Sequence, residues 1–253
     1  MNPTARLRSE ALNPAAAAET VSPLVALVPY FTMFIFFFLL VSGSGYMLSS
    51  VSREKENRTM EVLLVSLEPR QLMLGKVLGL GLVTLVQMAI WLGGGVLVFS
   101  SPVDISALAG SIEFPPNFLL WALLFFLAGY FLYGALMGMV GALAPNAREA
   151  SQFTFVVLLP LLVPLWLNSA LTHNPNGTLA VVFSLFPFTA PITIMTRLAA
   201  GPLPLWQLLI ALAGLIVTAY LCVALAARSF RADTLLSAAP LSWQRLRREW
   251  RSA

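Results

Sequence analysis

The charged stretch from Arg53 to Glu68 holds the side chains of this sequence best suited to binding a partner. Seven of the chain's 26 Asp, Glu, Lys and Arg residues lie in it, between two long apolar runs. Because a charge is costly to bury in a membrane, such a block has to stay in water beside the bilayer. Its apolar residues recur at the spacing of one helix face: Met60, Leu63, Leu64 and Leu67. The pattern predicts an amphipathic helix at about 53–67, either simply solvated or docking a soluble partner.

Patterns typical of enzymes are missing. Gly75-Lys76 is followed by Val77 and has no glycine five positions earlier, so it is not a phosphate-binding loop. His173 is the only histidine and has no carboxylate nearby in the sequence, so we interpret it as a solvated loop residue rather than a metal ligand or proton relay. Cys222 lies in an apolar run, as a small core or lipid-facing residue does. The sequence predicts no catalytic, cofactor-binding or metal-binding residues.

The composition indicates an integral membrane protein. Hydrophobic residues make up 58% of the chain and charged residues 10%, with a mean hydropathy of +0.84. Charged residues are about 25% of an ordinary soluble domain. The 253 residues leave room for five or six spans but not for an added catalytic domain of usual size. Any energy source must therefore come from another chain.

The apolar runs divide the region 24–227 into spans and connections. We predict an all-α polytopic membrane helix bundle with about five transmembrane helices, at about 24–49, 75–99, 118–143, 150–168 and 203–227. Prolines inside the fourth span predict a kink. The apolar stretch before the last span is broken by Pro187 and Pro191, which predicts one or two short re-entrant or interfacial helices.

Lysine and arginine positions predict the orientation. If the loop after the first span is inside, twelve basic residues are cytoplasmic and only Arg6, Arg8 and Arg197 are outside. The positive-inside rule then places the N-terminus outside and the C-terminus in the cytoplasm. Residues 1–23 become an external polar tail, which predicts an upstream helix that is missing from this chain or supplied by another.

The C-terminal residues 228–253 predict a cytoplasmic basic amphipathic tail. Trp243 and Trp250 lie among four arginines, as in helices held at the bilayer surface by indole rings and anionic headgroups. With no nucleic-acid motif beside it, the expected partner is the lipid bilayer. Elsewhere, Gly134 and Gly138 stand four apart, which allows close helix approach, either within the chain or across a dimer interface.

The charged stretch also carries a specific resemblance. Glu54-Lys55-Glu56, the run from Thr59 to Leu64, Pro69 and Leu74-Gly75-Lys76 are similar to the signature of type-2 ABC transporter permeases. Arg148-Glu149-Ala150 and the proline-broken stretch Phe186 to Pro191 fit it as well, and Arg228-Ser229-Phe230-Arg231 resembles the sodium-efflux-like branch. The resemblance covers about 24–236. An N-terminal span and a large external domain usually precede this region in the family, and neither is in this sequence.

The resemblance implies a permease subunit of an ATP-driven exporter in the plasma membrane. Its cytoplasmic helix is expected to dock on a separate ABC ATP-binding subunit, which binds the ATP, while the permease forms a homodimer or heterodimer. The expected coupling residues are Glu54, Glu56, Arg58, Glu61 and Leu64. Their role is coupling rather than catalysis. The alternative is a truncated or degenerate permease that serves as a non-transporting membrane scaffold.

Overall fold

The structure is a computed structural model that describes residues 23–57, 59, 63, 65, 68–99 and 117–229. In these residues all regular secondary structure is helical. The five long helices are α1 (Pro23–Glu56), α3 (Pro69–Phe99), α5 (Phe118–Leu143), α6 (Ala147–Trp166) and α10 (Leu205–Ser229). Each is long and apolar enough to cross a membrane. The predicted all-α membrane bundle with about five spanning helices is therefore confirmed. The predicted tails, 1–23 and 228–253, lie almost wholly outside the described residues.

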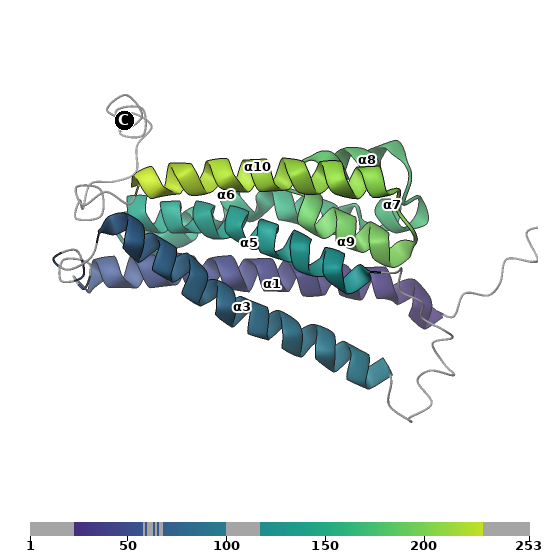
Figure 1. Cartoon of the computed structure of the whole chain (residues 1–253), viewed down its shortest axis with the longest axis horizontal. Coiled ribbons are helices and arrows are strands. Elements are labelled where there is room, and N and C mark those ends of the chain that lie inside the picture. The colour runs from purple at the N-terminus through teal and green to yellow at the C-terminus, as the bar shows by residue number, and fades with distance from the viewer. Residues whose placement is uncertain are drawn as a thin grey trace, which may run out of the picture.

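The long helices run side by side in alternating directions (Figure 1). Helices α1, α5 and α10 finish at the end from which α3 and α6 begin, which we call the charged end. The three short helices lie toward the opposite end, which we call the Arg197 end: α7 (Asn168–His173), α8 (Thr178–Leu185) and α9 (Ala190–Ala200). The described residues therefore cross the bundle five times, and the three short helices form the connection between α6 and α10.

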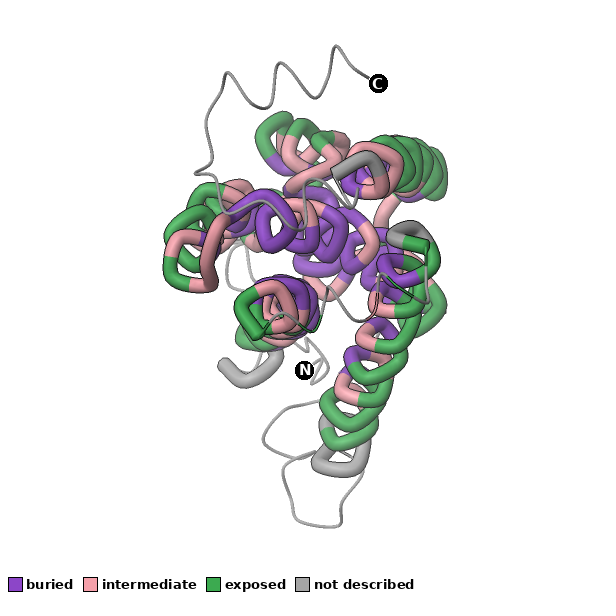
Figure 2. Tube along the Cα trace, turned by 90° about the vertical axis from the view of Figure 1, so that its left-hand side faces the viewer, coloured by how far each residue is buried: buried purple, intermediate pink, exposed green. Residues whose placement is uncertain are grey.

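Helix α5 forms the centre of the bundle, packed between α1 and α10. Buried residues gather in the middle of the assembly and exposed ones on its outer faces (Figure 2). Small residues allow the close contacts: a Cβ on Gly129 would lie 2.9 Å from Pro191 of α9, and one on Gly141 would lie 3.1 Å from Val51 of α1. Because lipid is as apolar as leucine, such close packing is a main source of helix association in membranes.

The predicted pair Gly134 and Gly138 is buried within α5. A Cβ on Gly134 would meet the ring of Tyr130 on the same helix at 3.7 Å. Both glycines therefore lie in the interior of the single chain. A dimer interface at these glycines stays a prediction.

Helix α3 is the least enclosed of the long helices and leans away from α1 toward its C-terminal end (Figure 1). Only 17% of its most apolar window is buried. The side chains of Leu82, Val86 and Ile90 are more than half exposed. In a bilayer, such a face is in contact with lipid or another helix.

The apolar stretch before α10 holds two short helices, α8 and α9, in agreement with the predicted one or two, and α7 precedes them. Pro187 ends α8, and Pro191 occupies the first turn of α9, where the missing N–H costs nothing. Tyr133 of α5 donates a hydrogen bond to the Phe188 carbonyl in the turn between them. Helix α9 is buried along most of its length, packed chiefly against α1, which makes it part of the core.

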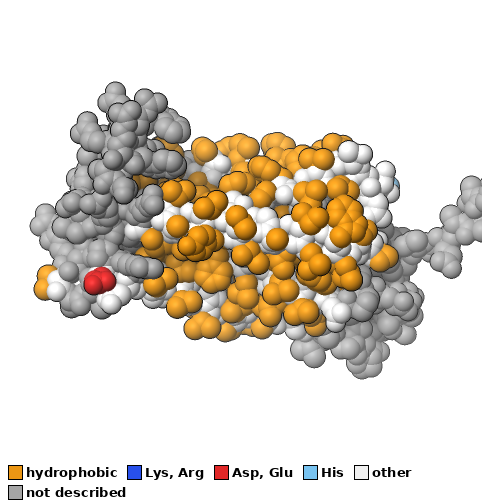
Figure 3. All heavy atoms as spheres, turned by 45° about the horizontal axis from the view of Figure 1, so that its top comes forward, with side chains coloured by type: hydrophobic (Ala, Val, Ile, Leu, Met, Phe, Trp, Pro, Cys, Tyr) orange, Lys and Arg blue, Asp and Glu red, His pale blue; other side chains and the backbone are white. Residues whose placement is uncertain are grey.

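The surface between the two ends is apolar. Figure 3 shows one face on which hydrophobic side chains form a broad band, with an acidic side chain visible only at one end. This distribution matches a bilayer, which excludes charge from its hydrocarbon core but not from its two surfaces.

Candidate functional site

The last turn of α1 projects polar side chains at the charged end. Helix α1 has no glycine or proline after Gly45, and it continues without a break through Glu56. The Asn57 amide donates to the Arg53 carbonyl at 2.9 Å and closes the last turn. Glu54 and Glu56, which the sequence analysis placed on a separate coupling helix, therefore lie on the end of a spanning helix.

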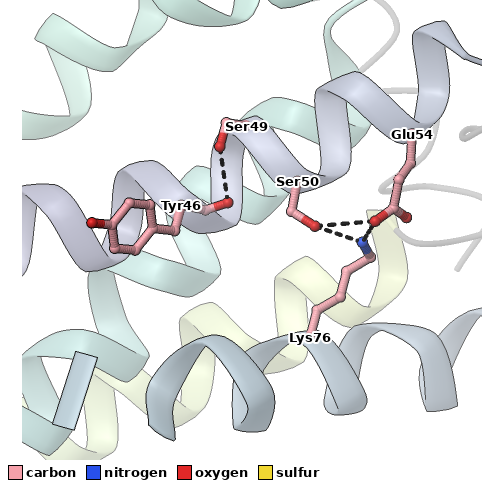
Figure 4. Close-up of polar contacts among 5 residues, drawn as sticks. All are labelled: Tyr46, Ser49, Ser50, Glu54 and Lys76. Carbon is pink, nitrogen blue, oxygen red and sulfur yellow. Dashed lines mark hydrogen bonds and ion pairs between the residues drawn. The ribbon is translucent and has the colours of Figure 1, made fainter. Parts of the chain in front are cut away.

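Glu54 holds the start of α3. Its carboxylate forms an ion pair with Lys76, whose ammonium also donates to the Ser50 hydroxyl at 2.8 Å, and Ser50 donates to Glu54 at 3.1 Å (Figure 4). The exposed fractions of the two charged side chains are 10% for Lys76 and 28% for Glu54. Because this pair is largely shielded from water, its attraction is stronger than that of an open surface pair.

Lys55 holds the end of α5. Its ammonium donates to the carbonyl oxygens of Ala142 at 2.8 Å and Ala144 at 2.9 Å. The last carbonyls of a helix lack intrahelical donors and carry the negative end of the helix dipole. Lys55 thus supplies both donors and a positive charge where α5 needs them.

Glu56 holds the start of α6. One of its carboxylate oxygens accepts a hydrogen bond of 2.6 Å from the backbone amide of Ala147, the first residue of that helix. The Asn146 side chain caps the same turn by accepting from the Glu149 amide at 2.8 Å. A carboxylate is favourable at the positive end of a helix dipole, so Glu56 and Asn146 together complete the first turn.

Three successive residues of α1 therefore bind three different helices in the last turn of α1. The arrangement links the end of α1 mechanically to three long helices. No group of three or more His, Cys, Asp or Glu side chains that could hold a metal ion occurs in the part of the chain that the structure describes. Of the other predicted coupling residues, Arg58, Glu61 and Leu64 lie outside the described residues.

Lys55 and Lys76 were not among the predicted site residues. The sequence does show that both are lysines at the boundary of an apolar run. Lysines at such boundaries usually reach toward water. Their partners, a carbonyl pair 87 and 89 residues away and a carboxylate 22 residues away, cannot be read from local spacing.

Arg197 forms a second polar cluster, at the Arg197 end. Its side chain is fully buried, and its guanidinium donates to Ser184 at 2.6 Å, to Gln207 at 2.8 Å, to Asn176 at 3.4 Å and to the Pro175 carbonyl. All four acceptors are neutral. Burial lowers the pKa of Arg197 to about 10, so the group stays charged at neutral pH.

Arg197 was predicted to be one of three external basic residues, and its burial was not predicted. It lies within α9, at the end of the bundle opposite Glu54. A signal was present, because Arg197 is the only Asp, Glu, Lys or Arg between Glu149 and Arg228. A single charged residue in so apolar a stretch is expected to have polar partners or a functional role.

His173 and Cys222 lie on different helices, α7 and α10. The His173 ring is exposed at the end of α7, with Nδ1 2.7 Å from the Ser169 carbonyl one turn earlier. Cys222 is a buried free thiol in α10. The exposure of His173 and the burial of Cys222 agree with the predicted solvated histidine and the predicted core or lipid-facing cysteine.

Comparison with known proteins adds the family. Residues 13–228 match the family described as ABC-2 family transporter protein. The uncharacterized protein MJ1024 of Methanocaldococcus jannaschii is 30% identical over 220 residues, which cover 87% of this chain and 53% of that protein. The uncharacterized protein YhaP of Bacillus subtilis is 25% identical over 228 residues, covering 88% and 54%. The chain spans about half the length of these curated relatives, and no solved structure matches it. Since the family match extends over most of its length, the chain belongs to the ABC-2 family of transporter membrane proteins.

Proposed function

We propose that this chain is the membrane-spanning permease subunit of an ATP-driven exporter, and that ATP is hydrolysed on a separate ATP-binding subunit. Family membership supports the transporter class. The observation that carries the coupling role is the last turn of α1, which binds α3, α5 and α6 at the base of the charged stretch. A protein docked on that stretch acts on three spanning helices at once.

The orientation in the proposal follows the basic residues. With the charged end in the cytoplasm, twelve of the 15 Lys and Arg residues are inside, as the positive-inside rule favours. The N-terminus is then outside, the C-terminus is cytoplasmic, and the charged stretch can reach a soluble ATPase.

The two sets of predicted coupling residues have different roles in this proposal. Arg58, Glu61 and Leu64 are the proposed contacts with the partner, on the amphipathic segment itself. Glu54 and Glu56 already engage Lys76 and Ala147 within the chain, so they position the segment rather than meet the partner. Dimerisation of the permease, through a homodimer or heterodimer, completes the pathway.

The cargo is proposed only at the level of class. The spanning helices carry no Asp, Glu or His away from their ends, so no carboxylate-lined ion path runs through the described bundle. An apolar pathway suits lipid-like, drug-like or peptide cargo. The C-terminal run Arg228 to Arg231 supports the sodium-efflux-like branch as the finer assignment, with sodium as the competing cargo.

The test is co-purification in mild detergent of the chain with the ATP-binding protein encoded beside its gene. We expect the wild-type chain to retain the partner and Glu61→Arg to lose it. His173→Arg, which adds a charge at the opposite end, is the matched control and should retain it. No association with the wild type would refute the proposal. Association in which the chain leaves the partner's ATP turnover unchanged would favour the non-transporting scaffold instead.

A further inference from the structure

The corner between α5 and α6 brings two opposite helix ends together. The carbonyls of Ala142 and Ala144 form the negative end of α5, and the amide of Ala147 belongs to the positive end of α6. Lys55 and Glu56, adjacent on α1, place a positive charge on the first and a negative charge on the second. The order of the two charges matches the order of the two helix ends.

This matching differs from an ordinary ion pair. The Glu54–Lys76 contact joins two side chains, so exchanging the two residues restores opposite charges in the same place. Lys55 and Glu56 instead bond to the ends of α5 and α6. The polarity of a helix end is fixed by the backbone and cannot be exchanged. The two contacts therefore respond differently to the same kind of charge swap.

We propose that Lys55 and Glu56 act as positioning residues that link the segment 57–68 to the α5–α6 corner, so that docking of an ATP-binding partner moves the start of α6. The inference rests on the proposed function for the identity of the partner. It adds the element that receives the motion and the three hydrogen bonds that carry it.

Helix α6 is suited to receive such a motion. Only 22% of its most apolar window is buried, and Phe155 and Val156 are exposed on its outer side. Pro160 and Pro164 interrupt its second half, where each removes an intrahelical hydrogen bond. The first half can therefore tilt without carrying the whole helix, and the tether at its start is the Glu56 bond to Ala147.

The first experiment uses the full chain alone in lipid nanodiscs. Hydrogen exchange is followed in the peptide covering 144–152, because the Ala147 amide donates directly to Glu56. In the swap Lys55→Glu with Glu56→Lys, exchange of this amide should rise about tenfold, as expected when a charge-assisted bond is lost. The swap Glu54→Lys with Lys76→Glu is the matched control and should leave it unchanged. The neutral pair Lys55→Gln with Glu56→Gln should give an intermediate rise, and it serves if the charge swap fails to fold.

The second experiment adds the ATP-binding protein and nucleotide. In the wild type and in the Glu54/Lys76 swap, partner binding should change exchange in 144–152. In the Lys55/Glu56 swap the partner should still bind, because the segment 57–68 is intact, but the change at 144–152 should disappear and ATP turnover should no longer respond to the chain.

The outcomes separate the two proposals. Unchanged exchange of Ala147 in the Lys55/Glu56 swap, or a partner-induced change at 144–152 that persists there, overturns the relay and leaves the proposed function standing. Failure of the partner to bind the wild-type chain overturns the proposed function and the relay with it.

Discussion

The buried guanidinium of Arg197 offers the clearest quantitative test of the fold. Arg197→Met replaces it with a shorter unbranched side chain that donates no hydrogen bond. Ser184 keeps its own bond to the Ala180 carbonyl at 2.7 Å, and Asn176 is exposed enough to bond water. The Pro175 carbonyl also loses its donor, but that residue is half-buried and water can reach it. The cost therefore falls mainly on Gln207, which is 6% exposed and loses its 2.8 Å donor.

One buried acceptor left without a donor costs about 1–3 kcal/mol. For a chain of this size, that corresponds to a fall in Tm of about 2–12 °C. The companion change Gln207→Glu places a carboxylate beside the guanidinium. In the wild-type background the carboxylate has a counter-charge, whereas in Arg197→Met it is a buried charge alone.

The two changes should therefore be strongly coupled. Isolating one member of a buried charge pair costs about 3–5 kcal/mol, so Gln207→Glu should be more harmful by roughly that amount in the Arg197→Met background. The assay is a double-mutant cycle of thermal unfolding in nanodiscs, followed by intrinsic fluorescence. A coupling energy below about 1 kcal/mol, or an Arg197→Met variant as stable as the wild type, contradicts the buried network.

Two further predictions concern packing around α9. Gly129→Ala places a Cβ 2.9 Å from Pro191 and should lower the Tm. Gly79→Ala, with no atom within 4 Å of its Cβ, is the control and should leave the Tm equal or higher. Thermal unfolding of both variants is the measurement, and an equal fall in Tm would contradict the close α5–α9 contact. Tyr133→Phe removes the donor to the Phe188 carbonyl and should cost about 1 kcal/mol by the same assay, while Tyr220→Phe, on an exposed face of α10, is the control.

The sequence predicts the long helices of this chain well because the physics that sets them is local. A run of about 20 apolar residues without charge is enough to span a bilayer, and each of the five runs became a helix. The end of α1 was harder. The charges from Arg53 onward predict departure from the membrane, but leaving the membrane does not end a helix, and nothing after Gly45 breaks it before Glu56.

The polar contacts could not be predicted because their partners are remote in the chain. Glu54 was expected to contact a partner protein, but its carboxylate forms an ion pair with Lys76 of α3. Arg197 was expected to face water, yet four acceptors from α8, α10 and the turn before α8 surround it. Spacing within one helix carries no information on which helix ends will meet.

The distribution of these contacts follows from the solvent. In a bilayer, apolar contacts between helices gain little over contacts with lipid, so they determine packing but only weakly determine register. Hydrogen bonds and charges determine register better. Among the described residues, the Glu54–Lys76 ion pair and the Arg197 network lie at opposite ends of the bundle, and the Ser42–Gln87 hydrogen bond lies between them. Helix α1 carries Lys55 and Glu56 at one end and packs against α9, which carries Arg197, along its other half. A displacement of the last turn of α1 must therefore strain the Arg197 network unless α1 bends between them.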